Sequence, residues 1–297
     1  PSPMYMSSIN GQAICNACGS TQAKPIFTKF DYDLVECAQC GLAYIANPPT
    51  PDDLAASYQS DADYHTELHD PATPQFARMT RVAAKHLEVV RRWTQPGKLL
   101  DAGCSTGLFL DQARNAGYDG EGVEFSRASA DFARSHFGLR VTDGDIHAVT
   151  AAPETFDTIT MFDVIEHVPD PMRDLAAIHR LLKPGGTFVV STPNIDGIFP
   201  RLSLKVAKAL DYWPHPEPPH HLYQFSVKTL SAMLAKAGFE AGEVHHINID
   251  LAYSFGTLST LARMPKRAAY ALAFAPVAKI GPWFGSGDWF YMAARKR

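Results

Sequence analysis

From residue 98 onward, short apolar runs alternate with segments of helical periodicity, and this alternation restricts the fold more than any other feature of the chain. Such a rhythm is typical of βαβ units, in which strands form a parallel sheet and helices cover its faces. The expected strands are residues 98–102, 122–125, 139–142, 158–162, 187–191, 244–249 and 289–294. The expected helices are residues 108–115, 128–137, 171–182 and 227–237. The sequence therefore predicts an α/β fold with a doubly wound, mostly parallel seven-stranded sheet.

The rest of the chain divides around this core. We expect a small module over residues 1–47, a linker with a helical lid over residues 48–96, and a ligand-binding domain over residues 97–297. Within the second part, residues 74–93 carry apolar side chains at helical spacing and predict a long amphipathic helix. Insertions at 195–225 and 251–287 interrupt the core pattern, and late insertions of this kind lie over the carboxyl ends of the strands, where ligands bind.

The N-terminal module is defined by two C-x-x-C pairs. Cys15 and Cys18 form the first pair and Cys37 and Cys40 the second, a spacing typical of zinc ribbons. Four thiolates complete a tetrahedral Zn²⁺ shell, so we expect a structural rather than a catalytic ion. A redox pair or free buried thiols are the alternative. Because the module has few Lys and Arg residues, we expect it to dock against the rest of its own chain.

Charge and hydropathy limit the partners of the chain. The formal net charge is −4 over 297 residues, so no overall positive field favours a nucleic-acid substrate. No apolar run approaches the roughly 18 residues that span a bilayer, and no leader of the secretory type begins the sequence. We therefore expect a soluble, cytoplasmic protein that binds no nucleic acid.

The clearest chemical signal lies between the first expected strand and its helix. Residues 99–107 read Leu-Leu-Asp-Ala-Gly-Cys-Ser-Thr-Gly, and small residues at such a turn let the backbone approach a ligand closely. The pattern is neither the G-x-G-x-x-G of dinucleotide sites nor a phosphate-binding P-loop, which ends in Lys-Ser/Thr. Asp101 stands at the strand end, and an acid there suits a ligand with a cationic amine and no phosphates.

This segment resembles motif I of class I S-adenosylmethionine (SAM)-dependent methyltransferases, D/E-x-G-x-G-x-G, with Ser105 at the middle glycine. The resemblance implies a Rossmann-like fold, with Glu124 on the ribose hydroxyls and the segment after Gly144 on the adenine. Cys104 is expected to be a small packed residue near the cofactor rather than a nucleophile. The expected cofactor-binding residues are Asp101, Gly103, Cys104, Ser105, Gly107, Glu124, Phe125, Asp145, Ile146 and Phe162.

Two histidine motifs point to the acceptor. Glu166-His167-Val168 resembles the E-H-V segment of the ubiquinone O-methyltransferase-like branch, and residues 219–226 resemble the P-x-H-L-x-x-F-S element of bacterial small-molecule and sugar methyltransferases. His167 and His221 are therefore the candidate catalytic residues, because an imidazole suits a base at neutral pH. The alternatives are a helix-capping histidine and a buried, hydrogen-bonded one. Tyr58 and Tyr64 are candidates for an aromatic lid.

The resemblance implies SAM as a cofactor, beside the structural Zn²⁺ that the cysteine spacing indicates, and O-methylation of a small-molecule, sugar or glycan-precursor acceptor. Three alternatives stay open: a lipidic acceptor such as a quinone at a membrane surface, C-methylation of a sugar, and a non-catalytic scaffold on a degenerate core. The basic, apolar segments 195–215 and 257–280 suit peripheral membrane contact, a lid or the face of a homodimer.

Overall fold

The computed structural model of the chain describes residues 8–9, 12–50, 54, 68–210, 213, 218, 220–248 and 258–297. Tyr58 and Tyr64, the residues expected to form an aromatic lid, lie outside these ranges. In the described part of the chain, no helix combines the length and the apolar character needed to cross a membrane.

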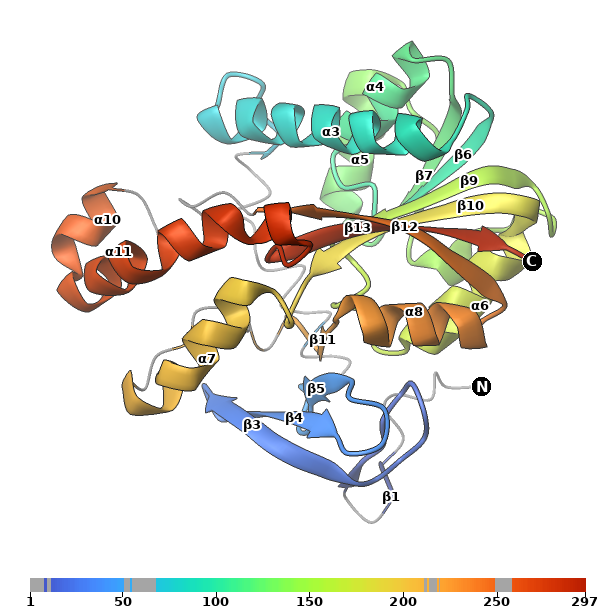
Figure 1. The fold of residues 1–297 in the computed structure, drawn as a ribbon. Helices are drawn as coiled ribbons and strands as arrows, with labels where there is room; N and C mark the ends of the chain where they lie inside the picture. Colours follow the sequence, from blue (N-terminus) through green and yellow to red (C-terminus); the bar gives the residue numbers. More distant parts are fainter. Residues whose placement is uncertain are drawn as a thin grey trace.

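A seven-stranded sheet forms the centre of the molecule, with strand order β12-β13-β10-β9-β6-β7-β8 (Figure 1). Its strands are β6 (Lys98–Ala102), β7 (Asp119–Glu124), β8 (Val141–Asp143), β9 (Phe156–Phe162), β10 (Leu182–Pro193), β12 (Phe239–Ile247) and β13 (Trp289–Lys296). Only β13 runs antiparallel to its neighbours, β10 and β12. The doubly wound, mostly parallel sheet expected from the sequence is confirmed.

Helices cover both faces of this sheet (Figure 1). On one face lie α3 (Pro74–Trp93), α4 (Leu108–Asn115) and α5 (Arg127–Phe137); on the other lie α6 (Pro171–Leu181) and α8 (Val227–Lys236). Polar side chains cap the first turns of α3, α5, α6 and α8, namely Thr73, Ser126, Asp170 and Ser226. Because both faces are covered, central strand residues such as Phe188 and Val190 are fully buried.

The order of the strands places the ligand site. The chain winds from β6 outward through β7 to β8, then returns to add β9 and β10 on the other side of β6. The loops that follow β6 and β9 therefore leave the sheet in opposite directions and open a crevice at the carboxyl ends of these strands. In open α/β sheets, ligands bind in the crevice at this reversal.

A separate four-stranded sheet carries the cysteine pairs. Its order is β11-β5-β4-β3, from β3 (Ala23–Lys29), β4 (Tyr32–Cys37), β5 (Ala43–Ile45) and β11 (Tyr223–Gln224). A short hairpin of β1 (Ser8–Ile9) and β2 (Gln12–Ala13) precedes it. Cys15, Cys37 and Tyr44 pack in the same core cluster as Leu222 and Phe225, so the module docks against its own chain as its composition indicated.

The two insertions form a helical layer beside the sheet (Figure 1). They contain α7 (Ile198–Leu210), α10 (Leu258–Arg263), α11 (Pro265–Ile280) and the 3₁₀ helix η2 (Gly281–Phe284). Phe199 of α7 packs against Tyr270 and Phe274 of α11, with ring centroids 6.1 and 5.8 Å apart. The insertions thus share a small apolar core of their own.

Candidate functional site

The turn after β6 has the tight backbone that its sequence predicts. Gly103 and Gly107 have φ angles of 81° and 79°, in the left-handed region that favours glycine. A Cβ at Gly103 would lie 2.5 Å from a methyl carbon of Val164, and one at Gly107 would lie 2.6 Å from Leu139. Ser105, which stands at the middle glycine of the motif, adopts a φ of 48°. The serine therefore keeps the backbone course that a glycine would give.

Asp101 lies at the floor of this turn and is almost fully buried. The Thr160 hydroxyl donates a 2.7 Å hydrogen bond to its Oδ1. Burial raises the pKa of Asp101 to about 7, and the charge of Glu124 adds to this effect. The resemblance to a SAM site implies a cationic amine beside these carboxylates. Such an amine would favour their charged forms.

Glu124, at the end of β7, connects the turn to the loop that follows its own strand. Its Oε2 accepts a 2.8 Å hydrogen bond from the Ser105 backbone amide, and its Oε1 accepts a 2.7 Å bond from the amide of Ser126. The carboxylate thus holds the amides of two separate loops. The sequence could not predict these contacts, because they depend on the orientation of the Ser105 and Ser126 amides in the folded chain.

Cys104 turns its side chain into the protein interior. A Cβ at Gly122 of β7 would lie 2.5 Å from the Cys104 sulfur, so the missing side chain of Gly122 makes room for the thiol. Burial raises the pKa of this thiol, which keeps it protonated and unreactive. The geometry agrees with a packed residue whose contact with a cofactor would run through the backbone.

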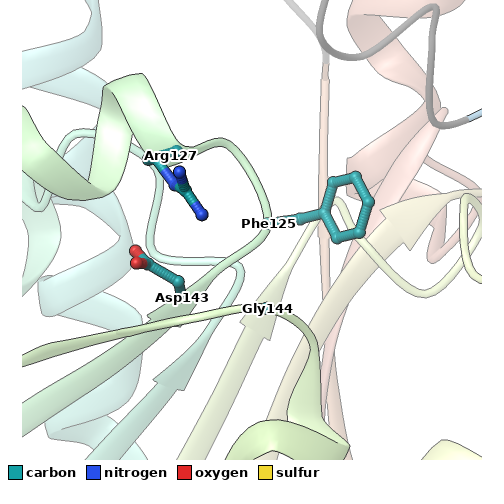
Figure 2. A pocket seen from close by; sticks show the side chains of 4 residues that line it. All are labelled: Phe125, Arg127, Asp143 and Gly144. Atoms are coloured by element: carbon teal, nitrogen blue, oxygen red, sulfur yellow. The ribbon is translucent and has the colours of Figure 1, made fainter.

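The expected adenine end lies beyond β7 and β8. Phe125 is half exposed, and together with Arg127, Asp143 and Gly144 it lines a hollow of about 330 Å³ (Figure 2). In Figure 2 the Phe125 ring points away from the charged side chains of Arg127 and Asp143. The hollow therefore has an apolar border on one side and a charged border on the other.

The residues after Gly144 do not share one environment. Asp145 is exposed and caps the 3₁₀ helix η1 (Ile146–Ala148), with its Oδ1 accepting a 2.9 Å bond from the His147 amide. Ile146 is 3% exposed and packs in the main core. Of the two, Asp145 is the one that is exposed to solvent.

Phe162, the last residue of β9, belongs to an aromatic cluster. Its ring stacks on His86 of α3, with centroids 4.2 Å apart and the planes 2° from parallel. His86 Nδ1 forms a 2.8 Å hydrogen bond with the Tyr291 hydroxyl, and burial lowers the pKa of His86 to about 4. Helix α3, which lies within the region 48–96, thus packs on the core through a neutral histidine.

Asp163 follows Phe162 at the carboxyl end of β9, and the sequence analysis did not single it out. Its φ of 55° is unusual for a residue other than glycine and turns the chain sharply at the crevice. Its Oδ1 accepts 2.6 Å hydrogen bonds from the Ser191 hydroxyl and the Trp289 indole. The available signal was an acid directly after the fourth strand, close to the carboxyl end of its strand as Asp101 and Glu124 are of theirs.

The two candidate catalytic histidines lie together. The rings of His167 and His221 are 4.6 Å apart between centroids and nearly perpendicular. With the buried Glu166 carboxylate, their potential ligand atoms all lie within 4.8 Å of one another. Such a group can accept a proton or hold a divalent cation. Glu166 also receives a 2.9 Å bond from the Thr192 hydroxyl, which fixes the carboxylate in the cluster.

The tautomer of His167 follows from its neighbour. His167 Nδ1 lies 3.0 Å from the carbonyl oxygen of His220, so Nδ1 carries the hydrogen and donates it. Burial lowers the pKa of His167 to about 4, so the ring is neutral at pH 7. With the hydrogen on Nδ1, Nε2 is the unprotonated nitrogen of this neutral ring.

The four module cysteines form one cluster whose sulfur atoms all lie within 4.8 Å of one another. Cys15 and Cys40 are 3.5 Å apart at their sulfurs, as are Cys18 and Cys37. A tetrahedral ZnS₄ centre needs sulfur–sulfur separations of about 3.8 Å, so the donor set and its size fit Zn²⁺. Each pair is followed by a glycine at positive φ, Gly19 at 79° and Gly41 at 80°.

The strand order, the glycine turn and the strand-end carboxylates together define a class I methyltransferase fold. A family described as a methyltransferase domain matches residues 76–244, more than half of the chain. The chain belongs to this family.

Curated relatives and a solved structure agree with this family. A ubiquinone biosynthesis O-methyltransferase of Methylococcus capsulatus is 39% identical over 103 residues, covering 33% of this chain and 44% of the relative. The enzyme of the same name from Coxiella burnetii is 34% identical over 148 residues, covering 48% and 59%. The chain thus spans about half the length of these relatives. A SAM-dependent methyltransferase from Thermotoga maritima has the same fold, with a TM-score of 0.53, 22% identity and coverage of 78% and 99%.

Proposed function

We propose that the protein transfers a methyl group from SAM to an oxygen atom of a small-molecule, sugar or glycan-precursor acceptor. The observation that carries the proposal is the meeting of His167 and His221 beyond the carboxyl end of β9, beside a turn suited to SAM. When bound, SAM supplies a sulfonium methyl that is electrophilic without further activation. The protein then has to align two reactants and remove one proton.

Cofactor binding falls to the β6–β8 side of the crevice. Asp101 and the backbone around Gly103 would face the amino-acid end of SAM, and Glu124 would accept the ribose hydroxyls. Phe125 and Asp145 would border the adenine. Support for these roles comes from the burial of Asp101, the position of Glu124 at the end of β7 and the hollow beside Phe125.

Acceptor chemistry falls to the histidine pair. The neutral His167 presents Nε2 as a proton acceptor, and His221 lies in ring contact with it. In the transfer step the acceptor oxygen would form a bond to the methyl carbon, the carbon–sulfur bond would break, and the hydroxyl proton would pass to an imidazole. The O-methyltransferase names of the curated relatives favour oxygen over carbon as the atom methylated.

We expect His167→Ala and His221→Ala to lower kcat by about 10²- to 10⁴-fold, the usual contribution of a positioned acid–base group. The dissociation constant for S-adenosylhomocysteine should stay within about twofold, because neither ring belongs to the cofactor half. His136→Ala, on the exposed end of α5, is the matched control. Steady-state kinetics with calorimetry would read both quantities, and unchanged turnover in both variants would remove the pair from the mechanism.

A lipidic acceptor such as a quinone is the second candidate, and exposed apolar side chains on the insertions favour it. Leu272 of α11 and Trp283 of η2 are each 82% exposed, and Phe284 is 74% exposed. The exposed bases Arg201, Lys205 and Lys279 lie on the neighbouring helices α7 and α11. Apolar and basic groups on one layer suit the surface of an anionic membrane.

Vesicle co-sedimentation should separate this candidate from a soluble acceptor. For membrane contact, we expect binding to vesicles containing phosphatidylglycerol, weaker binding at high salt, and loss of binding in Trp283→Ser/Phe284→Ser. Phe30→Ser is the matched control, since Phe30 is 73% exposed on the cysteine module. Dimerisation that disappears in the double variant, without vesicle binding, would instead assign the layer to a homodimer face.

A further inference from the structure

The acceptor histidine His221 begins a segment that is held by the cysteine module. Two residues further on, Tyr223 and Gln224 form β11, which pairs with Tyr44 and Ala43 of β5. The Ile45 amide donates a further 2.9 Å hydrogen bond to the Leu222 carbonyl. β11 is thus the edge strand of the module's sheet and takes no place in the seven-stranded sheet.

The opposite side of the same segment holds the other histidine motif. The amides of Leu222 and Tyr223 both donate to the Glu166 carbonyl, over 2.8 and 3.1 Å. The Tyr223 hydroxyl donates a 3.0 Å bond to the Pro169 carbonyl. Because Glu166 and Pro169 flank His167, the segment from His221 to Gln224 links the module to the loop that carries His167.

A second connection runs from the first cysteine pair itself. Asn16, between Cys15 and Cys18, donates a 2.8 Å bond to Asp170 and accepts a 3.0 Å bond from the Met172 amide. These two residues begin α6, directly after the His167 segment. The backbone course that the cysteines impose therefore fixes the start of α6 as well.

The cofactor turn is packed differently. Cys104 and Leu108 belong to a second core cluster, formed with α3, α4 and α5 on the other face of the sheet. The module's buried residues Cys15, Cys37 and Tyr44 lie in the first cluster, with Leu222 and Ile165, and this cluster also contains Leu100 and Ala102 of β6. The module is hydrogen-bonded directly to β11 and to the start of α6, so a change in it should reach the acceptor segments before it reaches the glycine turn.

We propose that the four-cysteine module is a positioning element for the acceptor half of the site, and that its bound metal holds the His167 and His221 segments in register. The module's contact with β11 and Asn16's contact with the start of α6 are the observations that carry this inference. The acceptor role of the histidines rests on the proposed function, whereas the coupling between metal and segments does not.

Hydrogen–deuterium exchange of the full chain, with metal and after chelation, tests the coupling without any substrate. On metal removal we expect amides in residues 163–170 and 220–226 to exchange about tenfold faster, while residues 99–107 and 119–126 stay within about twofold. S-adenosylhomocysteine affinity, measured on the same samples, should be retained. Unchanged exchange in residues 220–226 would overturn the proposal.

If chelation unfolds the whole chain, a point variant that keeps the metal site tests the coupling instead. Asn16→Ala keeps all four cysteines but removes both bonds to α6; we expect normal metal content, faster exchange over residues 169–173 and a lower kcat with cofactor affinity unchanged. Asn47→Ala is the matched control, because the Asn47 side chain forms its hydrogen bonds with the backbone of Asp31 and Asp33, both within the module. Equal behaviour of the two variants would overturn the proposal. If the exchange rates change locally as expected but the wild-type protein transfers no methyl group, the proposed function is refuted and the coupling between metal and segments stands.

Discussion

Serine at both Cys37 and Cys40 should abolish stoichiometric zinc binding and lower the Tm by about 10 °C. The module is too small to bury a sufficient core by itself, so metal binding would contribute much of its folding free energy. Its residues also pack in the main core cluster, so the loss should spread beyond the module. Elemental analysis of the purified protein and scanning calorimetry would measure the two effects.

The fifth cysteine provides the control for that experiment. Cys104 is buried away from the cluster, so Cys104→Ser should leave the zinc content at one ion per chain. Wild-type protein prepared with zinc present but holding none of it would end the assignment of a zinc site. Zinc retained in the double variant would move the site to other residues.

Replacement of Glu124 by alanine should weaken S-adenosylhomocysteine binding by about 100-fold or more, the equivalent of about 3 kcal/mol for two charge-assisted hydrogen bonds. The same side chain accepts the Ser105 and Ser126 amides, so its removal should also loosen the glycine turn. Both effects act in the same direction on affinity. Isothermal titration calorimetry would give the change directly.

Two further variants make the Glu124 result specific. Glu121→Ala removes a carboxylate from the same strand, three residues before the crevice, and should leave affinity unchanged. Glu124→Gln keeps one acceptor oxygen and should give an intermediate loss. If Glu124→Ala binds as tightly as the wild type, the ribose is held elsewhere.

Local pattern was sufficient to predict the elements that build the site. The helix Pro74–Trp93, the strand Lys98–Ala102 and the helix Leu108–Asn115 have the predicted boundaries, because caps and periodicity act within a few residues. Strand β10 is longer than the predicted 187–191, since it continues at both ends along its neighbours. Pairing across a sheet leaves only a weak trace in the sequence of a single strand.

Long-range contacts account for what the sequence could not show. The strand β11 has two residues, too few for any periodic signal, yet it unites residues 43–45 with the His221 segment. The sequence offered two separate histidine motifs, and only the fold places their rings 4.6 Å apart. Glu124's amide contacts and the sharp turn at Asp163 likewise depend on three-dimensional neighbours.

Direct titration of the purified wild-type chain with S-adenosylhomocysteine tests the central claim, that the crevice between β6 and β9 is a SAM site. The account predicts saturable binding of one molecule per chain with a dissociation constant of about micromolar order. No detectable uptake, by calorimetry or by equilibrium dialysis, would contradict it and favour a zinc-containing scaffold on a methyltransferase fold that has lost its cofactor.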